Sequence, residues 1–356
     1  MKFISVLMLA FSLLGALDRI FGNKFGLGKE FERGFMLLGT MALSMIGMIV
    51  ISPFIAQILS PFFDVFYNTF GIDPSIIPAT FFANDMGGAA LAVEIAENEE
   101  IGLFNALVVS SMMGATISFT VPFGLGIVKK ELHREMFLGF LCGIVTIPIG
   151  CFVSGLTLGI SAYALFIDLL PLILFSAVIA VGLILIPEMC VKVFSILGVF
   201  IKIVITFGLA LGIFRFMTGI EIIKGLAPIE EGGAICLNAA IVISGAFPLI
   251  YVLSKVLNLP LKTLGSAIGI NNTSAIGLLS TLASNSPTFE IMNDMDKKGT
   301  MINSAFAVSA AFTFAGHLAF TMAFDAAYIS PMIIGKLISG FCALILSILL
   351  YKKLSK

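Results

Sequence analysis

Polar residues interrupt two apolar segments of this chain, at similar places in its two halves. In the first half, an Asn-Asp-Met-Gly-Gly stretch at 84–88 lies within the apolar run 78–96. In the second half, Asn-Asn-Thr-Ser at 271–274 lies within the run 264–283. A carboxylate in hydrocarbon is costly, so it usually occupies a protein-lined or wet cavity. Two interrupted segments in corresponding positions predict the binding site of a transporter.

Asp85 is the strongest candidate for direct chemistry, because its carboxylate can hold a small cation, a proton or an ammonium group. The two glycines that follow let the backbone turn and approach a ligand closely. A helix N-cap is the alternative role for Asp85, and the two roles are compatible. The second segment offers amides and hydroxyls without charge, which suit a ligand hydroxyl, although turn and capping chemistry also explain them. The substrate-binding residues predicted from both segments are Asn84, Asp85, Gly87, Gly88, Asn271, Asn272, Thr273 and Ser274.

Three further residues complete the predicted site. His317 is the only histidine inside an apolar run, and its unperturbed pKa near neutrality suits a proton relay. A buried, hydrogen-bonded structural histidine is the alternative. Ser111 and Ser309 fall at matched places in the two halves and can line the site, although small polar residues also pack helices together.

Composition places the chain among membrane proteins. Hydrophobic residues make up 59% of the 356 residues and charged residues 12%, whereas soluble proteins carry about twice that charge. Several apolar runs exceed the roughly 20 residues that span a bilayer as a helix. The net charge of −1 without a basic block argues against nucleic acid as a partner. We expect no cofactor or metal, because the chain lacks a P-loop and its histidines and five cysteines are too scattered for a zinc site.

The apolar runs suggest an internal duplication within one membrane domain, residues 1–356. The run at 161–187 has no counterpart, and the others pair in order across it. We therefore predict a first repeat at 1–159, a linking span at 160–189 and a second repeat at 190–356. The runs are 3–20, 34–56, 75–96, 101–128, 135–159, 161–187, 191–217, 232–255, 263–284, 299–326 and 331–351.

Loop charges distinguish two topologies, since cytoplasmic loops are rich in Lys and Arg. The loop 97–100 has no Lys or Arg and is predicted outside, whereas Lys297, Lys298 and the tail 351–356 are predicted inside. This pattern is self-consistent if both interrupted segments are re-entrant hairpins, which gives nine crossings and inverted repeats. Full crossings would instead give eleven spans and parallel repeats. The predicted fold is thus an all-α polytopic membrane protein with nine to eleven transmembrane segments, and hairpins are favoured.

Several short stretches along the chain, taken together, resemble the sequences of one protein family. They are Asn84 to Gly88 with Leu91-Ala92, Ser111 to Gly114 with Thr116-Ile117, Gly143 to Cys151, Ile186 to Met189, Asn271-Asn272, and Ile302-Asn303 through Ala305 to Phe312 and on to His317-Leu318. On these residues the chain resembles the ethanolamine-utilisation permeases of bacterial inner membranes. The resemblance implies uptake of ethanolamine, as its protonated cation, for a pathway that cleaves it to acetaldehyde and ammonia. Family members have an acidic residue immediately before the histidine, where this chain has Gly316.

We therefore expect a cell-membrane permease for a small ammonium-bearing solute, working by alternating access or facilitated diffusion. A secondary transporter of another small polar solute is the first alternative. An intramembrane enzyme or sensor subunit that transports nothing is the second, although no further catalytic group accompanies Asp85. The sequence leaves open the coupling ion and whether the chain forms a homo-oligomer within the lipid bilayer.

Overall fold

The computed structural model describes residues 2–354, and every regular element in this range is helical. The last two residues of the predicted cytoplasmic tail lie outside the described residues. The helices are α1 Lys2–Ile20, α2 Leu27–Phe70, α3 Ile76–Phe81, η1 Asn84–Met86, α4 Gly88–Ile95, α5 Glu99–Phe104, the π-helices η2 Asn105–Gly114 and η3 Thr116–Thr120, α6 Val121–Ile127, η4 Lys130–Leu132, α7 His133–Leu158, α8 Ala162–Asp168, α9 Leu170–Leu185, α10 Pro187–Thr218, α11 Ile229–Ile268, α12 Asn272–Ala283, α13 Asn285–Glu290, η5 Ile291–Asp294, α14 Lys297–Ala310, α15 Gly316–Phe324, η6 Ala326–Tyr328 and α16 Ile329–Leu354.

Six helical stretches within residues 2–354 are long and apolar enough to cross a membrane, and the bent pair α8–α9 brings the number to seven. The chain is therefore an all-α, polytopic membrane protein, as its composition predicts. The sequence prediction of nine to eleven spans is higher, because it counted segments that the structure divides into short helices. The run 299–326, for example, is divided into an α14 of 14 residues and an α15 of 9, each shorter than the roughly 20 residues of a crossing. The segment 75–96, a crossing only in the eleven-span alternative, contains an α3 of 6 residues and an α4 of 8.

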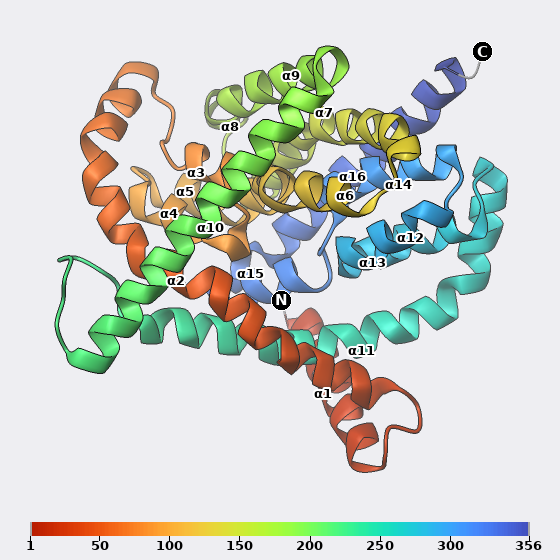
Figure 1. Ribbon diagram of the computed structural model, residues 1–356, viewed down its shortest axis with the longest axis horizontal. Coiled ribbons are helices and arrows are strands. Elements are labelled where there is room, and N and C mark those ends of the chain that lie inside the picture. The colour runs from red at the N-terminus through yellow and green to blue at the C-terminus, as the bar shows by residue number, and fades with distance from the viewer. Residues whose placement is uncertain (1, 355–356) are drawn as a thin grey trace.

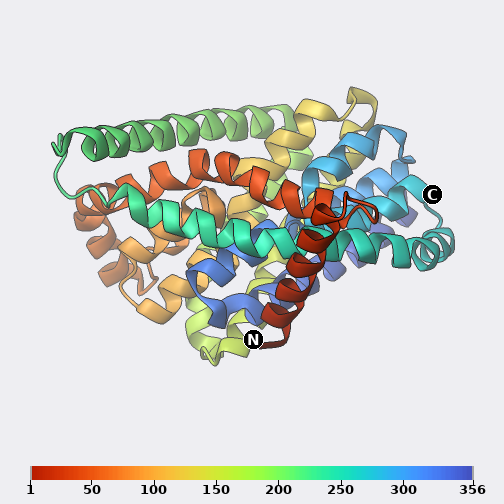
Figure 2. The same cartoon turned by 90° about the horizontal axis from the view of Figure 1, so that it is seen from below.

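Two long, curved helices, α2 and α11, cross each other along one side of the molecule (Figure 1). Each contains two internal prolines, Pro53 and Pro61 in α2 and Pro248 and Pro260 in α11. Proline removes one backbone hydrogen bond and bends a helix. α10 packs on α2, so that α10, α2 and α11 form one layer (Figure 2).

A second group of helices, α7, α14 and α16, packs together elsewhere in the molecule. Glycine permits the closest approaches in both groups, since it lets helix backbones touch. A Cβ on Gly150 of α7 would collide with the carbonyl of Gly335 in α16, and a Cβ on Gly208 of α10 would collide with the carbonyl of Gly47 in α2. The short helices lie between the groups: α4 contacts α2, α15 contacts α11, and α12 contacts both α11 and α14.

Candidate functional site

Asp85 lies in η1, at the turn between α3 and α4. Gly87 ends this turn with φ 92°, in the left-handed region that favours glycine. A Cβ on Gly87 would also collide with the side chain of Met48 in α2, and one on Gly88 would collide with the Phe82 carbonyl. The two predicted glycines therefore let the chain turn sharply and pack tightly just beyond Asp85.

The segment that carries Asp85 begins and ends at the same place in the fold. The carboxylate of Asp73 accepts backbone hydrogen bonds from Glu97 at 3.1 Å and Asn98 at 2.9 Å, and also from Ser75 at 3.0 Å. α3 and α4 pack against each other. Residues 73–98, called hairpin 1 below, therefore fold back on themselves, with a neck at Asp73 and a tip at Asp85.

A second segment closes in the same manner. The backbone N–H of Asn271 donates to the Asp296 carboxylate at 2.9 Å, and the Asn271 amide donates to the Asp294 carbonyl at 2.9 Å. The Ser274 hydroxyl also donates to Asp296, at 2.9 Å. α12 and α13 contact each other and are separated at Ser284. Residues 271–296, hairpin 2, thus have their neck at Asn271 and their tip near Ser284.

The predicted residues Asn271, Asn272, Thr273 and Ser274 lie at the neck of hairpin 2, whereas we expected them in the interior of the interrupted segment. Asn271 and Asn272 are exposed, Thr273 is half-buried and Ser274 is buried. The side chain of Asn271 accepts from the Ser274 backbone N–H at 2.9 Å and caps α12. A polar residue just before a helix is the usual capping arrangement, and this accounts for the difference.

The tip of hairpin 2 instead carries Asn285, which we did not predict. Asn285 is fully buried, and its amide donates to the Thr120 hydroxyl at 2.8 Å and to the Ala307 carbonyl at 3.4 Å. A buried amide at the tip therefore ties hairpin 2 to η3 and α14. In the sequence, Asn285 follows the end of the apolar run, where nothing distinguishes it from a loop residue.

His317, the predicted proton relay, lies beside Asp85. Its Nε2 is 3.9 Å from Asp85 Oδ1. The His317 side chain is 2% exposed and the Asp85 side chain 28% exposed, so that the carboxylate is the more open of the two. A Cβ on Gly316 would stand 3.8 Å from Asp85 Oδ2. The carboxylate next to this histidine therefore comes from hairpin 1 rather than from position 316.

His317 follows an unwound segment, residues 311–315, which touches the other hairpin. The backbone N–H of Phe312 donates to the Thr281 carbonyl at 3.1 Å, and that of Phe314 donates to the Leu282 carbonyl at 3.0 Å. Both carbonyls belong to the last turn of α12, just before the tip of hairpin 2. Residues 311–317 therefore join the two hairpins, with Asp85 at one end of the contact.

Lys336 of α16 completes the group, and we did not predict it. Its side chain is fully buried; Nζ donates to the Ser111 carbonyl at 2.6 Å and lies 3.0 Å from His317 Nδ1. The sequence signal was available, because a lysine within the apolar run 331–351 is as costly as a carboxylate. The negative charge of Asp85 consequently has a positive charge close by.

The remaining predicted residues differ in how well their side chains are bonded. Ser111 is buried and its hydroxyl donates to the Val108 carbonyl at 2.8 Å, so it serves Lys336 through its backbone only. Asn84 and Ser309 are also fully buried, and within the described residues their side-chain polar atoms have no hydrogen-bond partner. Such groups are rare in folded proteins. The amide of Asn84, next to Asp85 in η1, therefore has hydrogen-bonding capacity that the described residues leave unused.

Each hairpin is also held by an asparagine from the helical stretch that follows it. The Asn105 amide donates to the Ser75 hydroxyl at 2.9 Å and to Asp168 Oδ1 at 3.3 Å. The Asn303 amide donates to the Ser274 carbonyl at 2.9 Å. Both asparagines are fully buried. The two asparagines anchor the start of each hairpin. Asp168 takes part at hairpin 1, where it accepts a hydrogen bond from Asn105.

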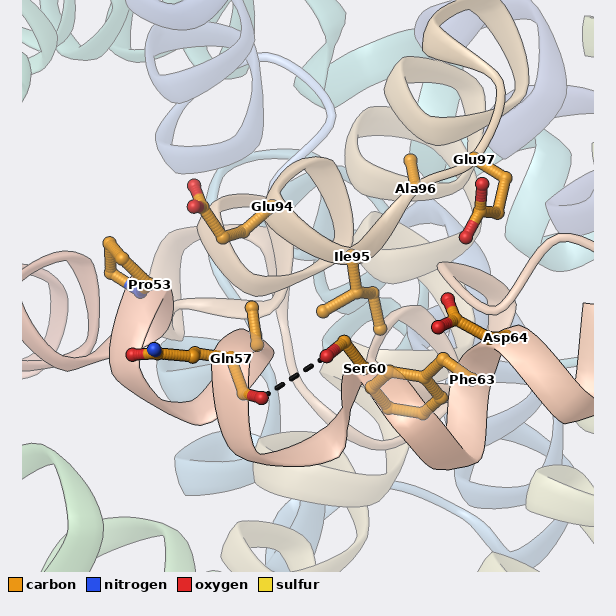
Figure 3. Close-up of a pocket in the computed structure, with 10 residues that line it drawn as sticks. Pro53, Gln57, Ser60, Phe63, Asp64, Glu94, Ile95, Ala96 and Glu97 are labelled. Atoms are coloured by element: carbon orange, nitrogen blue, oxygen red, sulfur yellow. Dashed lines mark hydrogen bonds between the residues drawn. The ribbon is translucent and has the colours of Figure 1, made fainter. Parts of the chain in front are cut away.

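A cavity of about 290 Å³ lies beside the end of hairpin 1 (Figure 3). Its wall combines Asp64 and Gln57 of α2 with Glu94 of α4 and the following Glu97, and no lysine or arginine lines it. A second cavity, of about 380 Å³, reaches Ser284 at the tip of hairpin 2. The second cavity is lined by Arg33, Lys255 and Glu30 together with apolar residues. The surroundings of the two hairpins thus differ in charge.

Comparison with known proteins identifies the family. The chain matches the family described as "Ethanolamine utilisation protein, EutH" over residues 1–350. A protein of Listeria monocytogenes named "Probable ethanolamine permease EutH" is 46% identical over 355 residues, covering 100% of this chain and 95% of that protein. A protein of Escherichia coli with the same name is 37% identical, covering 99% of this chain and 96% of the relative. An uncharacterised protein of Bacillus subtilis, YxeR, is 40% identical, covering 95% and 91%.

No solved structure matches the chain. The family match and the near-complete coverage of these relatives leave no part of residues 1–350 unaccounted for. The chain therefore belongs to the EutH family of ethanolamine utilisation proteins.

Proposed function

We propose that this protein is a permease that carries ethanolamine, as its ammonium cation, across the cell membrane. The observation that carries the proposal is Asp85: a partly exposed carboxylate at a hairpin tip, inside an apolar and otherwise closely packed fold. A carboxylate in such a place calls for a cationic partner. The names of the Listeria and Escherichia relatives supply the identity of that cation and describe transport rather than catalysis.

The arrangement around Asp85 suits both ends of ethanolamine. The ammonium group pairs with the carboxylate through charge-assisted hydrogen bonds, which are about twice as strong as neutral ones. Asn84 offers a buried amide without a partner, which can both donate to and accept from the hydroxyl group. In this proposal the Asn271 to Ser274 stretch holds the neck of hairpin 2, while Asp85 and Asn84 bind the substrate.

The same proposal includes two inverted repeats, residues 1–159 and 190–356, joined by a linking span at 160–189. The packing of α2 on α11 and of α7 on α16 supports it, since these are the pairs expected to correspond. Loop charge gives the direction of each hairpin. Exposed Glu99 and Glu100 follow the neck of hairpin 1, whereas Lys297 and Lys298 follow the neck of hairpin 2. Hairpin 1 then enters from outside and hairpin 2 from the cytoplasm, which allows alternating access around their contact.

The acidic cavity beside hairpin 1 favours a cation over an anion as the transported solute. Asp64, Glu94 and Glu97 place three negative charges around this cavity (Figure 3), and a cleft lined by one sign of charge concentrates ions of the opposite sign. A carrier for carboxylates would be disfavoured by such an approach path.

The experiment that tests this function is uptake of radiolabelled ethanolamine at acidic pH, where little neutral amine is present to enter passively. In cells without another ethanolamine transporter, expression of the chain should give saturable uptake above the empty-vector level. Asp85→Asn should reduce that uptake on the order of 30-fold or more, as expected for about 2 kcal/mol lost with one partner of a desolvated charge pair.

Competition separates ethanolamine from other small solutes. Unlabelled ethanolamine should block uptake at concentrations where a carboxylate or a nucleoside has no effect. Wild-type protein that is abundant in the membrane but gives no saturable uptake of ethanolamine would refute the proposed function.

A further inference from the structure

Lys336 has no role in the function proposed above, although it lies in the same group of residues. Its side chain is 0% exposed, whereas the Asp85 side chain is 28% exposed. His317 lies between them, with Nδ1 3.0 Å from Lys336 Nζ and Nε2 3.9 Å from Asp85 Oδ1. The three side chains therefore form a line that runs from the partly exposed carboxylate of Asp85 to the fully buried ammonium group of Lys336.

Hydrogen bonding couples the tautomer of His317 to the charge of Lys336. A charged lysine only donates hydrogen bonds, so His317 Nδ1 must accept from Lys336 while its proton resides on Nε2, facing Asp85. A neutral Lys336 could instead accept from Nδ1. A proton can thus leave Lys336 through the imidazole toward Asp85. The last step of 3.9 Å exceeds a direct hydrogen bond, so it needs a small side-chain movement or a bridging water.

Few other titratable groups face Lys336. Cys151 of α7, which is fully buried, also interacts electrostatically with Lys336, and Asp168 of α8 interacts in the same way with Cys151. Asp168 accepts its hydrogen bond from Asn105 rather than from Lys336. Within the described residues, Asp85 is therefore the carboxylate that balances the charge of Lys336.

This balance creates a conflict when a cation arrives. An ammonium group bound at Asp85 would place two positive charges beside one carboxylate in a poorly hydrated site. Like charges separated by about one imidazole ring still repel when little water screens them. The site relieves the repulsion by losing one positive charge, and the hydrogen-bonded line through His317 gives a route for the proton of Lys336.

We propose that the transported cation and the proton of Lys336 exchange one for one. Binding of the cation converts Lys336 from R–NH₃⁺ to R–NH₂, and the proton passes through His317 to water, so the net charge of the site stays constant. The proposal rests on the proposed function, because it uses the same carboxylate.

The exchange has a consequence for energetics. One cation moves inward for each proton that moves outward, so net transport equals that of the neutral amine and transfers no charge. The membrane potential acts only on charge that crosses. Uptake should therefore be insensitive to the potential and should follow the pH difference and the consumption of substrate inside the cell.

The test counts protons released when ethanolamine hydrochloride binds to the purified, detergent-solubilised full chain in a weakly buffered solution with a pH indicator dye. Binding itself is measured separately by calorimetry. Wild-type protein should release about one proton per bound cation at a pH where Lys336 is charged. In proteoliposomes, uptake should change less than twofold when the membrane potential is set by a potassium gradient and valinomycin.

Two substitutions separate charge from structure. Lys336→Met removes the competing charge, so the variant should bind ethanolamine at least as tightly as wild type and release no proton. Lys336→Arg keeps a charge that proteins do not deprotonate, so it should weaken binding tenfold or more. A purely structural lysine would make both variants poor binders. Size-exclusion chromatography checks that each variant is folded.

Several results would overturn the inference. If wild-type protein binds ethanolamine between pH 5.5 and 8 without releasing a proton, that result alone overturns the inference. Proton release that persists in Lys336→Met would assign the proton to Asp85 instead. Uptake that rises steeply with an inside-negative potential would also contradict it. Absence of ethanolamine binding by folded wild-type protein would refute the proposed function itself, which distinguishes the two failures.

Discussion

The two hairpins are closed by similar hydrogen bonds at their necks, but they carry different side chains at their tips. At each neck, a residue before the first helix is hydrogen-bonded to residues just before the helix that follows the hairpin: Asp73 to the backbone of Glu97 and Asn98, and Asn271 to Asp296. Each hairpin is also anchored by a buried asparagine further along the chain. At the tips, hairpin 1 presents Asp85 and hairpin 2 presents Asn285.

The difference separates structural from functional polarity. At the necks, Asp73, Asn271, Ser274 and Asp296 form hydrogen bonds within the protein, and these bonds hold each segment closed. At the tip of hairpin 1, the Asn84 amide has no partner within the described residues, and Asp85 stays partly exposed. At the tip of hairpin 2 the Asn285 side-chain oxygen also lacks a partner within the described residues, but Asn285 is fully buried and its amide donates to Thr120, whereas Asp85 is partly exposed. We infer that the similar necks position two tips, one of which binds.

The largest expected contrast between the hairpins is the side of the membrane from which each neck can be labelled. Glu99→Cys and Lys297→Cys place single cysteines at exposed positions beside the two necks. In a background without the five native cysteines, a membrane-impermeant maleimide added to intact cells should label Glu99→Cys only. Lys297→Cys should be labelled only after the membrane is opened, because lysine-rich loops face the cytoplasm.

Labelling of both cysteines from the same side would show that the hairpins do not enter from opposite faces. A cysteine placed in the tail, at Lys352, is the control for the cytoplasmic side.

The necks should differ in how much stability they contribute. Asp73→Ala leaves three backbone N–H groups without their charged acceptor, and hydrogen bonds to charged groups contribute about 1.5–3 kcal/mol each. Because Glu97 and Asn98 are exposed and their N–H groups can bond water instead, we expect a total loss of roughly 2–3 kcal/mol, seen as a lower midpoint of unfolding in mixed micelles. Asn271→Ala removes a helix cap and should cost about 1 kcal/mol.

Asp73→Asn is the matched control, since it keeps the shape and one acceptor and should lose less than Asp73→Ala. If Asn271→Ala proved more harmful than Asp73→Ala, the charged neck would not be the stronger one.

Substitution at the tip of hairpin 2 should affect uptake much less than substitution at the tip of hairpin 1. Asn285→Ala removes the hydrogen bond to Thr120 but also removes a buried oxygen that has no partner within the described residues. These effects offset each other, so we expect about 1 kcal/mol of destabilisation or less. Uptake per molecule of folded protein should fall less than threefold. A loss as large as that of Asp85→Asn would place the substrate at both tips.

The smallest effect concerns the cavities beside the hairpins. Glu94→Gln and Glu97→Gln reduce the negative charge of the cavity next to hairpin 1. Because this charge acts at a distance, the KM for ethanolamine should rise less than about threefold, and only at low salt. Uptake assays at two ionic strengths measure this. An increase that persists at high salt would indicate direct binding in the cavity.

Some of this site was predictable from the sequence and some was not. Asp85, Gly87, Gly88 and His317 stand out because a polar or flexible residue in an apolar run has few structural explanations, and the structure brings His317 Nε2 to 3.9 Å from Asp85 Oδ1. Lys336 carries the same signal, although the sequence prediction named carboxylates and a histidine and no lysine. The contact between Asp85 and His317 joins residues far apart in sequence, which no local pattern reveals.

The position of hairpin 2 was misjudged for a physical reason. Its polar stretch at 271–274 looks like the interruption around Asp85, yet it precedes a helix and caps it. Sequence alone does not distinguish an interruption within a segment from a cap at its start, since both need small polar side chains. The contact between the neck residues Asn271 and Asp296 settles the difference in the structure.

The central claim is that the substrate cation binds at the tip of hairpin 1, and direct titration of purified protein with ethanolamine by calorimetry tests it most directly. Wild-type protein and Glu94→Gln, a carboxylate change outside the tip, should bind with affinities within about threefold of each other at high salt. Asp85→Asn, equally well folded, should show no measurable binding. Unchanged affinity in Asp85→Asn would contradict the account.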